Sequence, residues 1–234
     1  MITTGVSQPI SLSSFSEPLP KSVAGLSLRI GGALNLNTDD NTYAYSPVGS
    51  IDAPVHYVGP NQINFQIPTG IPPGNVPAQL TRPDGSVMLT NFNISAAAPG
   101  IFSVLQNGAG QGAVLNGDFS QNGNPESILG ARPAPRGSLI YIFATGGGET
   151  DPPLLPGEPA PADGNPLVLT RIQPTVTIGG QTARVQFSGM APGWVGLWQI
   201  NAEIPNTISP GPAVPLTVTA DGVTSNTVTI AVEP

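Results

Sequence analysis

The sequence GPNQINFQIP at residues 59–68 returns as GLWQINAEIP at residues 196–205. The two copies share Gln-Ile-Asn and a closing Ile-Pro, at an offset of 137 residues (62 to 199). Apolar and polar residues alternate through both copies, which is the period of a half-buried β-strand. Proline closes each run because it cannot continue a hydrogen-bonded ladder. The repeat therefore predicts two related β units.

Turn signals around this element also repeat: Gly-Gly at residues 31–32 and 179–180, Ile-X-Pro-Gly at 71–74 and 208–211, and Asp-Gly at 84–85 and 221–222. About seven short strands per unit, separated by such turns, are typical of an immunoglobulin-like sandwich. We predict an all-β chain of two tandem immunoglobulin-like β-sandwich domains. Residues 1–98 form the first, with an extended N-terminal tail, and residues 99–234 the second, preceded by a β-hairpin around residues 107–110.

The composition favours turn-dense β structure over helix or disorder. The 234 residues include 29 glycines and 28 prolines, too many breakers for a mainly helical chain. Hydrophobic residues make up 39% and lie in regular strand-like runs, which argues against disorder. The most strand-like run is SLIYIF at residues 138–143, and residues 33–53 predict a polar hairpin that is inserted in the first copy only.

The charge of the chain excludes several classes of partner. Only 9% of residues are charged, against about a quarter in a typical protein. The net charge is −7 with 7 basic residues, so we expect no nucleic-acid binding and no attraction to anionic membranes. No apolar run approaches the ~18 residues of a membrane span, so we expect no membrane insertion.

The chain contains no cysteine, which excludes disulfides, zinc thiolates and thiol nucleophiles. This is compatible with a secreted bacterial protein. The N-terminus has neither the basic start nor the apolar core of a signal peptide. If the protein is exported, we expect this numbering to begin after the signal or within a longer precursor.

Groups for catalysis or metal binding are few, and we predict no enzyme, cofactor or metal. His56 is the only histidine, and we interpret it as an outward-facing strand residue. The chain therefore lacks residues that a catalytic triad and most zinc or copper sites require. Asn35, Asn37 and Asp39 alternate as in a calcium loop, but that loop's glycine and final carboxylate are missing. Solvated polar groups of a hairpin are the preferred interpretation.

Glycine-rich stretches do not supply a nucleotide site. Residues 108–113 formally fit a dinucleotide fingerprint, which works only where it opens a helix facing the pyrophosphate. The sequence VLNG follows instead, a strand end and a turn. The three glycines at 146–148 lack the Lys-Ser/Thr of a phosphate loop.

Two tryptophans stand four residues apart. Trp198 adjoins the repeated strand, and we predict that it packs in the core. Trp194 follows Pro192-Gly193, and we expect it to be more exposed. Packing in the core or an interface is one interpretation of Trp194, and stacking on a sugar ring is the other.

The sequence resembles the C-terminal repeat domains of secreted, uncharacterised proteins of Solibacter-type acidobacteria. The resemblance covers residues 9–234. Its motifs are APGIF (98–102), GQGAVLN (110–116), residues 137–145 with the following glycines, residues 176–180, FSGMAPGWVGLWQIN (187–201) and SNTVTI (225–230), with residues 19–20, 25–32 and 58–68 in the first copy. The resemblance implies tandem immunoglobulin-like folds outside the cell and carries no activity.

The N-terminal tail suggests a structural role. Its apolar and β-prone residues alternate, at Ile2, Thr4, Val6, Ile10 and Leu12, as in an extended strand. Such a segment can add to the exposed edge of a neighbouring sheet. The first copy opens with a weak strand at 10–15, where the second has the strong run SLIYIF. We predict that the tail of one subunit completes or augments the sheet of the next.

Head-to-tail strand addition of this kind gives a filament rather than a closed dimer. The leading hypothesis is therefore a non-enzymatic extracellular structural protein that associates with itself into a surface fibre. The alternative is an adhesion module that binds carbohydrate or a cell-surface partner, with Trp194 as the contact residue. The structural protein should assemble into fibres. The adhesion module should bind glycans, and that binding should depend on Trp194.

Overall fold

The computed structural model describes residues 4–11 and 18–233, so the tail residues Ile2 and Leu12 lie outside the described residues. Within these ranges the chain contains strands and turns and no helix, which confirms the all-β prediction. The strands belong to two compact units. Unit 1 comprises Met1–Ala96, Pro153–Asn165 and Pro192–Val195, and unit 2 comprises Ala97–Pro152, Pro166–Ala191 and Gly196–Pro234.

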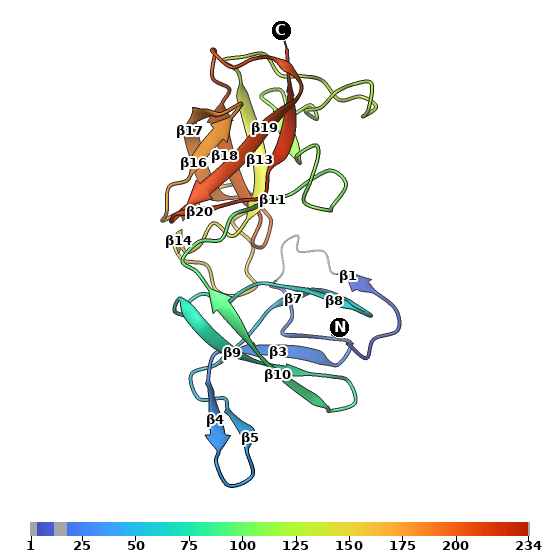
Figure 1. Cartoon of the computed structure of the whole chain (residues 1–234), viewed down its shortest axis with the longest axis vertical. Helices are drawn as coiled ribbons and strands as arrows, with labels where there is room; N and C mark the ends of the chain where they lie inside the picture. Colours follow the sequence, from blue (N-terminus) through green and yellow to red (C-terminus); the bar gives the residue numbers. More distant parts are fainter. Residues whose placement is uncertain (1–3, 12–17, 234) are drawn as a thin grey trace. The chain divides into compact units, whose positions relative to one another are not determined.

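Unit 1 contains two main antiparallel sheets (Figure 1). The first has β1 (Ile10–Ser11), β7 (Val55–Gly59) and β8 (Gln62–Phe65), in the order β1-β7-β8. The second has β2 (Ser22–Val23), β3 (Leu26–Ile30), β6 (Ile51–Asp52), β9 (Gly74–Thr81) and β10 (Val87–Ile94), in the order β10-β9-β3-β2 with β6 beside β3. Buried side chains from both sheets form a single core, among them Leu28, Ile30, Val55, Val58 and Leu80.

The inserted hairpin predicted at residues 33–53 is confirmed. It consists of β4 (Ala33–Asn37) and β5 (Thr42–Ser46), which form a sheet of their own (Figure 1). Its turn is held by Asp40, whose Oδ1 accepts hydrogen bonds from the Thr42 N at 3.1 Å and the Thr42 Oγ1 at 2.7 Å. These bonds stabilise the carboxylate and lower the pKa of Asp40.

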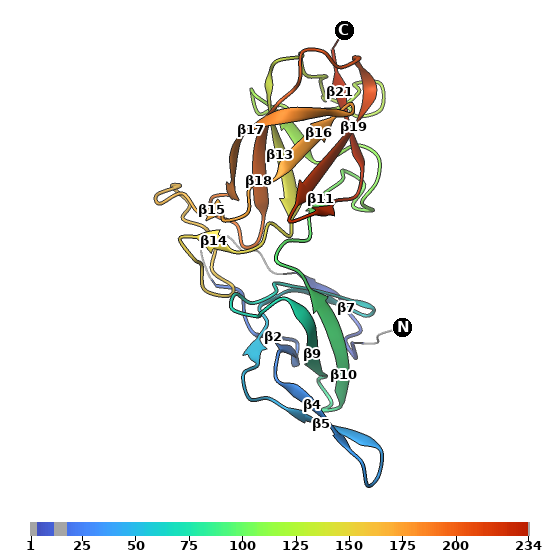
Figure 2. The same ribbon diagram turned by 60° about the vertical axis from the view of Figure 1, so that its left-hand side comes forward.

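Unit 2 is built on one long antiparallel sheet that curls around its core (Figure 2). Its strands are β11 (Gly100–Ile101), β12 (Val114–Asn116), β13 (Leu139–Thr145), β14 (Thr150–Asp151), β15 (Leu169–Thr170), β16 (Thr175–Ile178), β17 (Gln181–Met190), β18 (Trp198–Glu203), β19 (Gly211–Ala220), β20 (Val223–Thr224) and β21 (Val228–Val232). The main path is β11-β13-β18-β17-β16-β19-β20. Alternate residues of β13 and β18, including Ile140, Ile142 and Ile200, are fully buried because one face of each strand meets the core.

The hairpin predicted around residues 107–110 is present but short. The Val104 N donates to the Gln111 carbonyl oxygen at 2.9 Å and the Ala113 N to the Phe102 carbonyl oxygen at 2.7 Å, around an antiparallel bridge from Ser103 to Gly112, and beyond these residues β11 and β12 pair with β13. The strand β13 is long and its apolar residues alternate, so it offers β11 and β12 more cross-strand contacts at the core than these two short strands offer each other.

The sequence repeat is also a structural repeat. In unit 1 Tyr57 of β7 lies opposite Asn64 of β8, and in unit 2 Phe187 of β17 lies opposite Asn201 of β18. Both pairs follow a register shift immediately before the aromatic residue. The pairings of β3 with β9 and of β9 with β10 likewise recur as β16 with β19 and β19 with β21. The strand β8 of unit 1 therefore corresponds to β18 of unit 2.

Candidate self-association site

The N-terminal segment, residues 4–11, lies along the outer edge of β7 in its own unit 1. Thr4 is fully buried, and its Oγ1 donates a hydrogen bond to the carbonyl oxygen of Gly59 at 2.7 Å. The Thr4 N donates to the carbonyl oxygen of Pro60 at 3.1 Å. The Thr4 Oγ1 in turn accepts a bond from the Val6 N at 3.2 Å. Thr4 is thus the anchor of the segment.

The rest of the segment is held more lightly. Val6 is half-buried against the core of unit 1. Ile10 pairs with Val58 and Ser11 with Tyr57. The strand that β1 adds to the β7–β8 sheet is therefore only two residues long. Ile10 remains 37% exposed. Of the predicted association residues, the structure places Thr4, Val6 and Ile10 on unit 1, but only Ile10 lies in a strand, because the chain bends at residues 5, 7 and 8 and Gly5 has a φ of 76°.

Replacing Thr4 with valine should weaken the anchoring of this segment. The substitution keeps the shape of the side chain but removes the donor to the Gly59 carbonyl oxygen. We expect the free energy of unfolding of unit 1 to fall by about 1–3 kcal/mol, because a buried acceptor loses its partner. Urea denaturation measures the change, with Ser7→Ala at an exposed position of the segment as the control. Identical curves for Thr4→Val and the unsubstituted chain would contradict an anchoring role.

The two tryptophans have different surroundings. Trp198 is fully buried in unit 2, as predicted, and its Nε1 donates a hydrogen bond to the Ser188 Oγ at 2.9 Å. Trp194 is 37% exposed in unit 1, where its carbonyl oxygen accepts a bond from the Ala160 N at 3.2 Å. Unit 2 also contains a stacked aromatic pair that the sequence did not indicate. The exposed Phe119 stacks on Tyr141, with ring centroids 4.9 Å apart.

Residues with catalytic or metal-binding chemistry are dispersed. His56 lies in β7 and is half-buried. Across residues 4–11 and 18–233, no three His, Cys, Asp or Glu side chains gather in a group that could hold a metal ion. In the candidate calcium loop, the Asn37 Oδ1 accepts a bond from the Asp39 N at 3.1 Å, and Asp40 binds Thr42 as described above. These oxygen atoms stabilise the hairpin turn, as expected for local Asn and Asp side chains.

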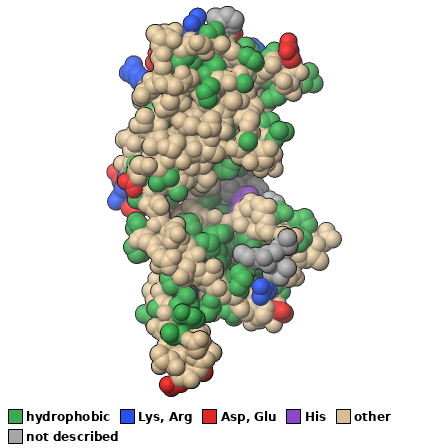
Figure 3. Space-filling model, viewed as in Figure 1, with side chains coloured by type: hydrophobic (Ala, Val, Ile, Leu, Met, Phe, Trp, Pro, Cys, Tyr) green, Lys and Arg blue, Asp and Glu red, His purple; other side chains and the backbone are tan. Residues whose placement is uncertain are grey.

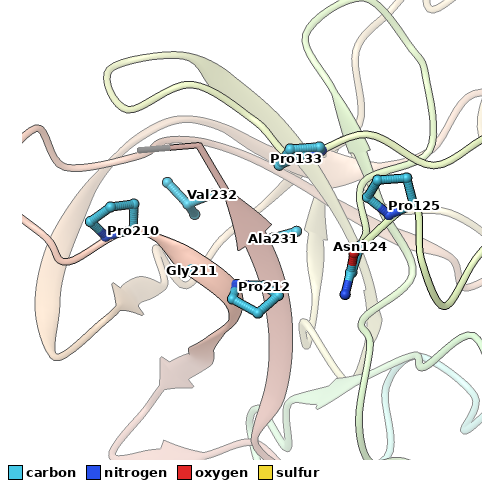
Figure 4. Close-up of a pocket in the computed structure, with 8 residues that line it drawn as sticks. All are labelled: Asn124, Pro125, Pro133, Pro210, Gly211, Pro212, Ala231 and Val232. Carbon is cyan, nitrogen blue, oxygen red and sulfur yellow. The ribbon is translucent and has the colours of Figure 1, made fainter.

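Two pockets on the described surface offer no reactive groups. A pocket of about 220 Å³ in unit 2 is lined by Asn124, Pro125, Pro133, Pro210, Gly211, Pro212, Ala231 and Val232. Pro210 lies on one side of it and Pro125 on the other (Figure 4). A second pocket, of about 400 Å³ in unit 1, is lined mainly by glycine, proline and aliphatic residues. Neither lining contains an ionisable or nucleophilic side chain, so neither is proposed as an active site.

The surface carries few charges. On the face drawn in Figure 3, a few charged side chains are scattered among hydrophobic side chains, uncharged polar side chains and backbone. Within residues 4–11 and 18–233, three ion pairs join partly exposed side chains and therefore contribute little to stability: Arg29–Asp52, Arg132–Asp118 and Arg171–Glu149. In the described part of the chain there is no helix that is long and apolar enough to cross a membrane.

The chain matches no protein-family model and no curated protein.

Proposed function

We propose that this chain is a non-enzymatic extracellular structural protein whose copies associate by strand addition through the N-terminal segment. Both units are interpreted as variants of the immunoglobulin-like sandwich, which provides a rigid body with exposed strand edges. The repeated strand pairings and the shared core of the two sheets in unit 1 support this interpretation. The extracellular location follows from the resemblance to domains of secreted proteins, and the absence of cysteine is compatible with it.

The observation that carries the proposal is the state of the N-terminal segment. Residues 4–11 follow the surface of unit 1, held by the hydrogen bonds of Thr4 and by a two-residue strand in which Ile10 and Ser11 pair with β7. A terminal segment that adds to a sheet in its own subunit can make equivalent contacts with another copy, because the backbone groups that it pairs with are the same in every copy.

Such a contact is heterologous, since the N-terminal segment of one copy meets unit 1 of another. Repetition of one heterologous contact gives a linear polymer unless the rotation happens to close a ring. The low charge favours this assembly, because only 14 acidic and 7 basic residues are spread over 234 positions. The net charge of −7 repels approaching copies at long range, but the N-terminal residues 1–11 carry no charged side chain, so the contact itself brings no like charges together.

Deletion of residues 1–11 tests the proposal. We expect the full chain to form concentration-dependent oligomers or fibres, and the deleted chain to remain largely monomeric. Sedimentation velocity measures the mass distribution, and electron microscopy distinguishes fibres from discrete particles. Circular dichroism controls for loss of the fold. A full chain that is monomeric at every concentration, or oligomers that survive the deletion unchanged, would contradict the proposal.

A further inference from the structure

The two copies of the repeated strand differ in what covers their edges. In unit 2, β18 lies in the interior of the sheet, with β17 on one side and β13 on the other. The pairing with β13 runs over six positions, from Leu139 opposite Glu203 to Ala144 opposite Trp198. Both edges of β18 are therefore occupied by neighbouring strands.

In unit 1, β8 pairs with β7 in the same register as β18 with β17. Within residues 4–11 and 18–233, however, no strand pairs with the other edge of β8, and β1 lies on the far side of β7. Unit 1 thus has, among its described strands, no counterpart of β13. The position that β13 fills in unit 2 is the free edge of β8.

The two strands present the same chemistry at this position. The Gln62 Nε2 donates to the Asn64 Oδ1 at 2.7 Å, and the equivalent bond in β18, from Gln199 to Asn201, is 2.9 Å long. Ile63 is half-buried against the core of unit 1. Its counterpart in β18, Ile200, faces the core of unit 2 and is fully buried. Within β8 there is no lysine, no other charged residue and no proline, so neither charge repulsion nor a missing backbone donor opposes strand addition there.

From this comparison, and resting on the proposed function, we infer that the free edge of β8 accepts the N-terminal segment of a second copy as an antiparallel strand. The incoming segment takes the place that β13 has in unit 2. The sheet of the acceptor then runs β7-β8 and continues into the donor strand, because the acceptor's own segment has left β7 to join the next copy.

Two properties favour the N-terminal segment as the occupant. The seven residues 2–8, which precede Pro9, match the seven-residue length of β13. Residues 1–11 contain no charged side chain, and neither does the acceptor stretch 59–68. In its own subunit the segment forms two strand pairs, at Ile10 and Ser11, and the hydrogen bonds of Thr4 to Gly59 and Pro60. A ladder along the four residues of β8 has to offset these contacts when the segment leaves β7.

Hydrogen exchange measured by mass spectrometry locates the acceptor edge. We compare the full chain at a concentration where it is assembled with the same chain diluted to monomer. Amides of residues 62–65 that face the free edge should exchange at least about tenfold more slowly in the assembled protein, because they gain a hydrogen-bonded neighbour. Amides of β10, at the edge of the second sheet, serve as the internal control.

The possible outcomes separate this inference from the proposed function. Assembly that depends on residues 1–11 but protects only residues 55–59 would overturn the β8 acceptor and leave strand addition intact. Absence of assembly would overturn both. Slower exchange at residues 62–65, with assembly that is lost on deletion of residues 1–11, supports both.

Cross-linking supplies a second readout, since the chain has no cysteine of its own. Copies with Asn64→Cys are mixed under oxidising conditions with copies carrying one cysteine at position 4, 6, 8 or 10. At least one tail position should form a disulfide with residue 64, because directly opposed residues bring their Cα atoms within about 4.4–6.8 Å. Asn91→Cys at an exposed position of β10 is the control acceptor. Equal cross-linking to residues 64 and 91 would overturn the inference.

Discussion

Replacing Trp198 with alanine is expected to lower the free energy of unfolding by about 3–5 kcal/mol. Trp198 is fully buried in the core of unit 2. Its Nε1 donates to the Ser188 Oγ at 2.9 Å, and that hydroxyl lies 2.6 Å from the Thr170 Oγ1. The alanine variant therefore loses the packing of an indole and leaves a buried hydroxyl pair without its third member.

Two further variants separate these contributions. Trp198→Phe retains most of the buried area but lacks the donor, so we expect a smaller loss, of about 1–2 kcal/mol. Trp194→Ala affects a side chain that is already 37% exposed, and its effect should be smaller than that of Trp198→Ala. Urea denaturation of the three variants measures the differences. Equal losses for Trp194→Ala and Trp198→Ala would contradict the assignment of Trp198 to the core.

The sequence predicted the repeated strands because their signal is local. Alternation of apolar residues identifies β8 and β18, and the Gly-Gly and Asp-Gly turns delimit the strands on either side. The inward residues Ile200 and Ala202 are buried as the alternation requires, and Gln199 and Asn201 are not. The period of the side chains along a strand is fixed by the backbone, so the buried face could be predicted without knowledge of the partner strands.

The assignment of residues 153–165 to unit 1 could not be predicted in this way. Gly157 N donates to the Gln66 Oε1 at 2.7 Å, and the Gly157 carbonyl oxygen accepts from the Leu19 N at 2.8 Å. Thr69 Oγ1 donates to the Leu154 carbonyl oxygen at 3.3 Å. Each of these bonds uses at least one backbone group of residues 154–157, and backbone groups are the same at every position. Neither periodicity nor residue type therefore indicates them.

The candidate site was predicted in part. Thr4, Val6 and Ile10 lie on unit 1, but the extended strand that the alternation indicated is limited to Ile10–Ser11, because the chain bends at residues 5, 7 and 8. The burial of Thr4 could not be expected from its residue type, since threonine is more often exposed. Its partners are the carbonyl oxygens of Gly59 and Pro60, which are 55 and 56 residues away in the sequence. Whether the segment pairs with another copy stays a prediction.

Asn122 is a second buried polar residue whose importance becomes visible only in the folded chain. It is fully buried, and its Nδ2 donates to the Ala231 carbonyl oxygen at 3.0 Å and to the Asn116 Oδ1 at 2.9 Å. Its Oδ1 accepts a bond from the Ala231 N at 2.9 Å. One side chain thus satisfies both backbone groups of a residue in β21 and fixes residues 116–122 against that strand.

Replacing Asn122 with alanine should therefore cost about 3–5 kcal/mol of unfolding free energy, because three buried polar atoms lose a partner and each such loss costs about 1–3 kcal/mol. Urea denaturation measures it, and Asn165→Ala, at an exposed position, should change stability by no more than about 0.5 kcal/mol. The variant Asn122→Asp adds a test, because burial of residue 122 predicts the direction in which its stability changes with pH. Burial raises the pKa of the new carboxyl in the folded state, so this variant should gain stability as the pH falls and the group becomes neutral. A variant with stability independent of pH would show that residue 122 is not enclosed.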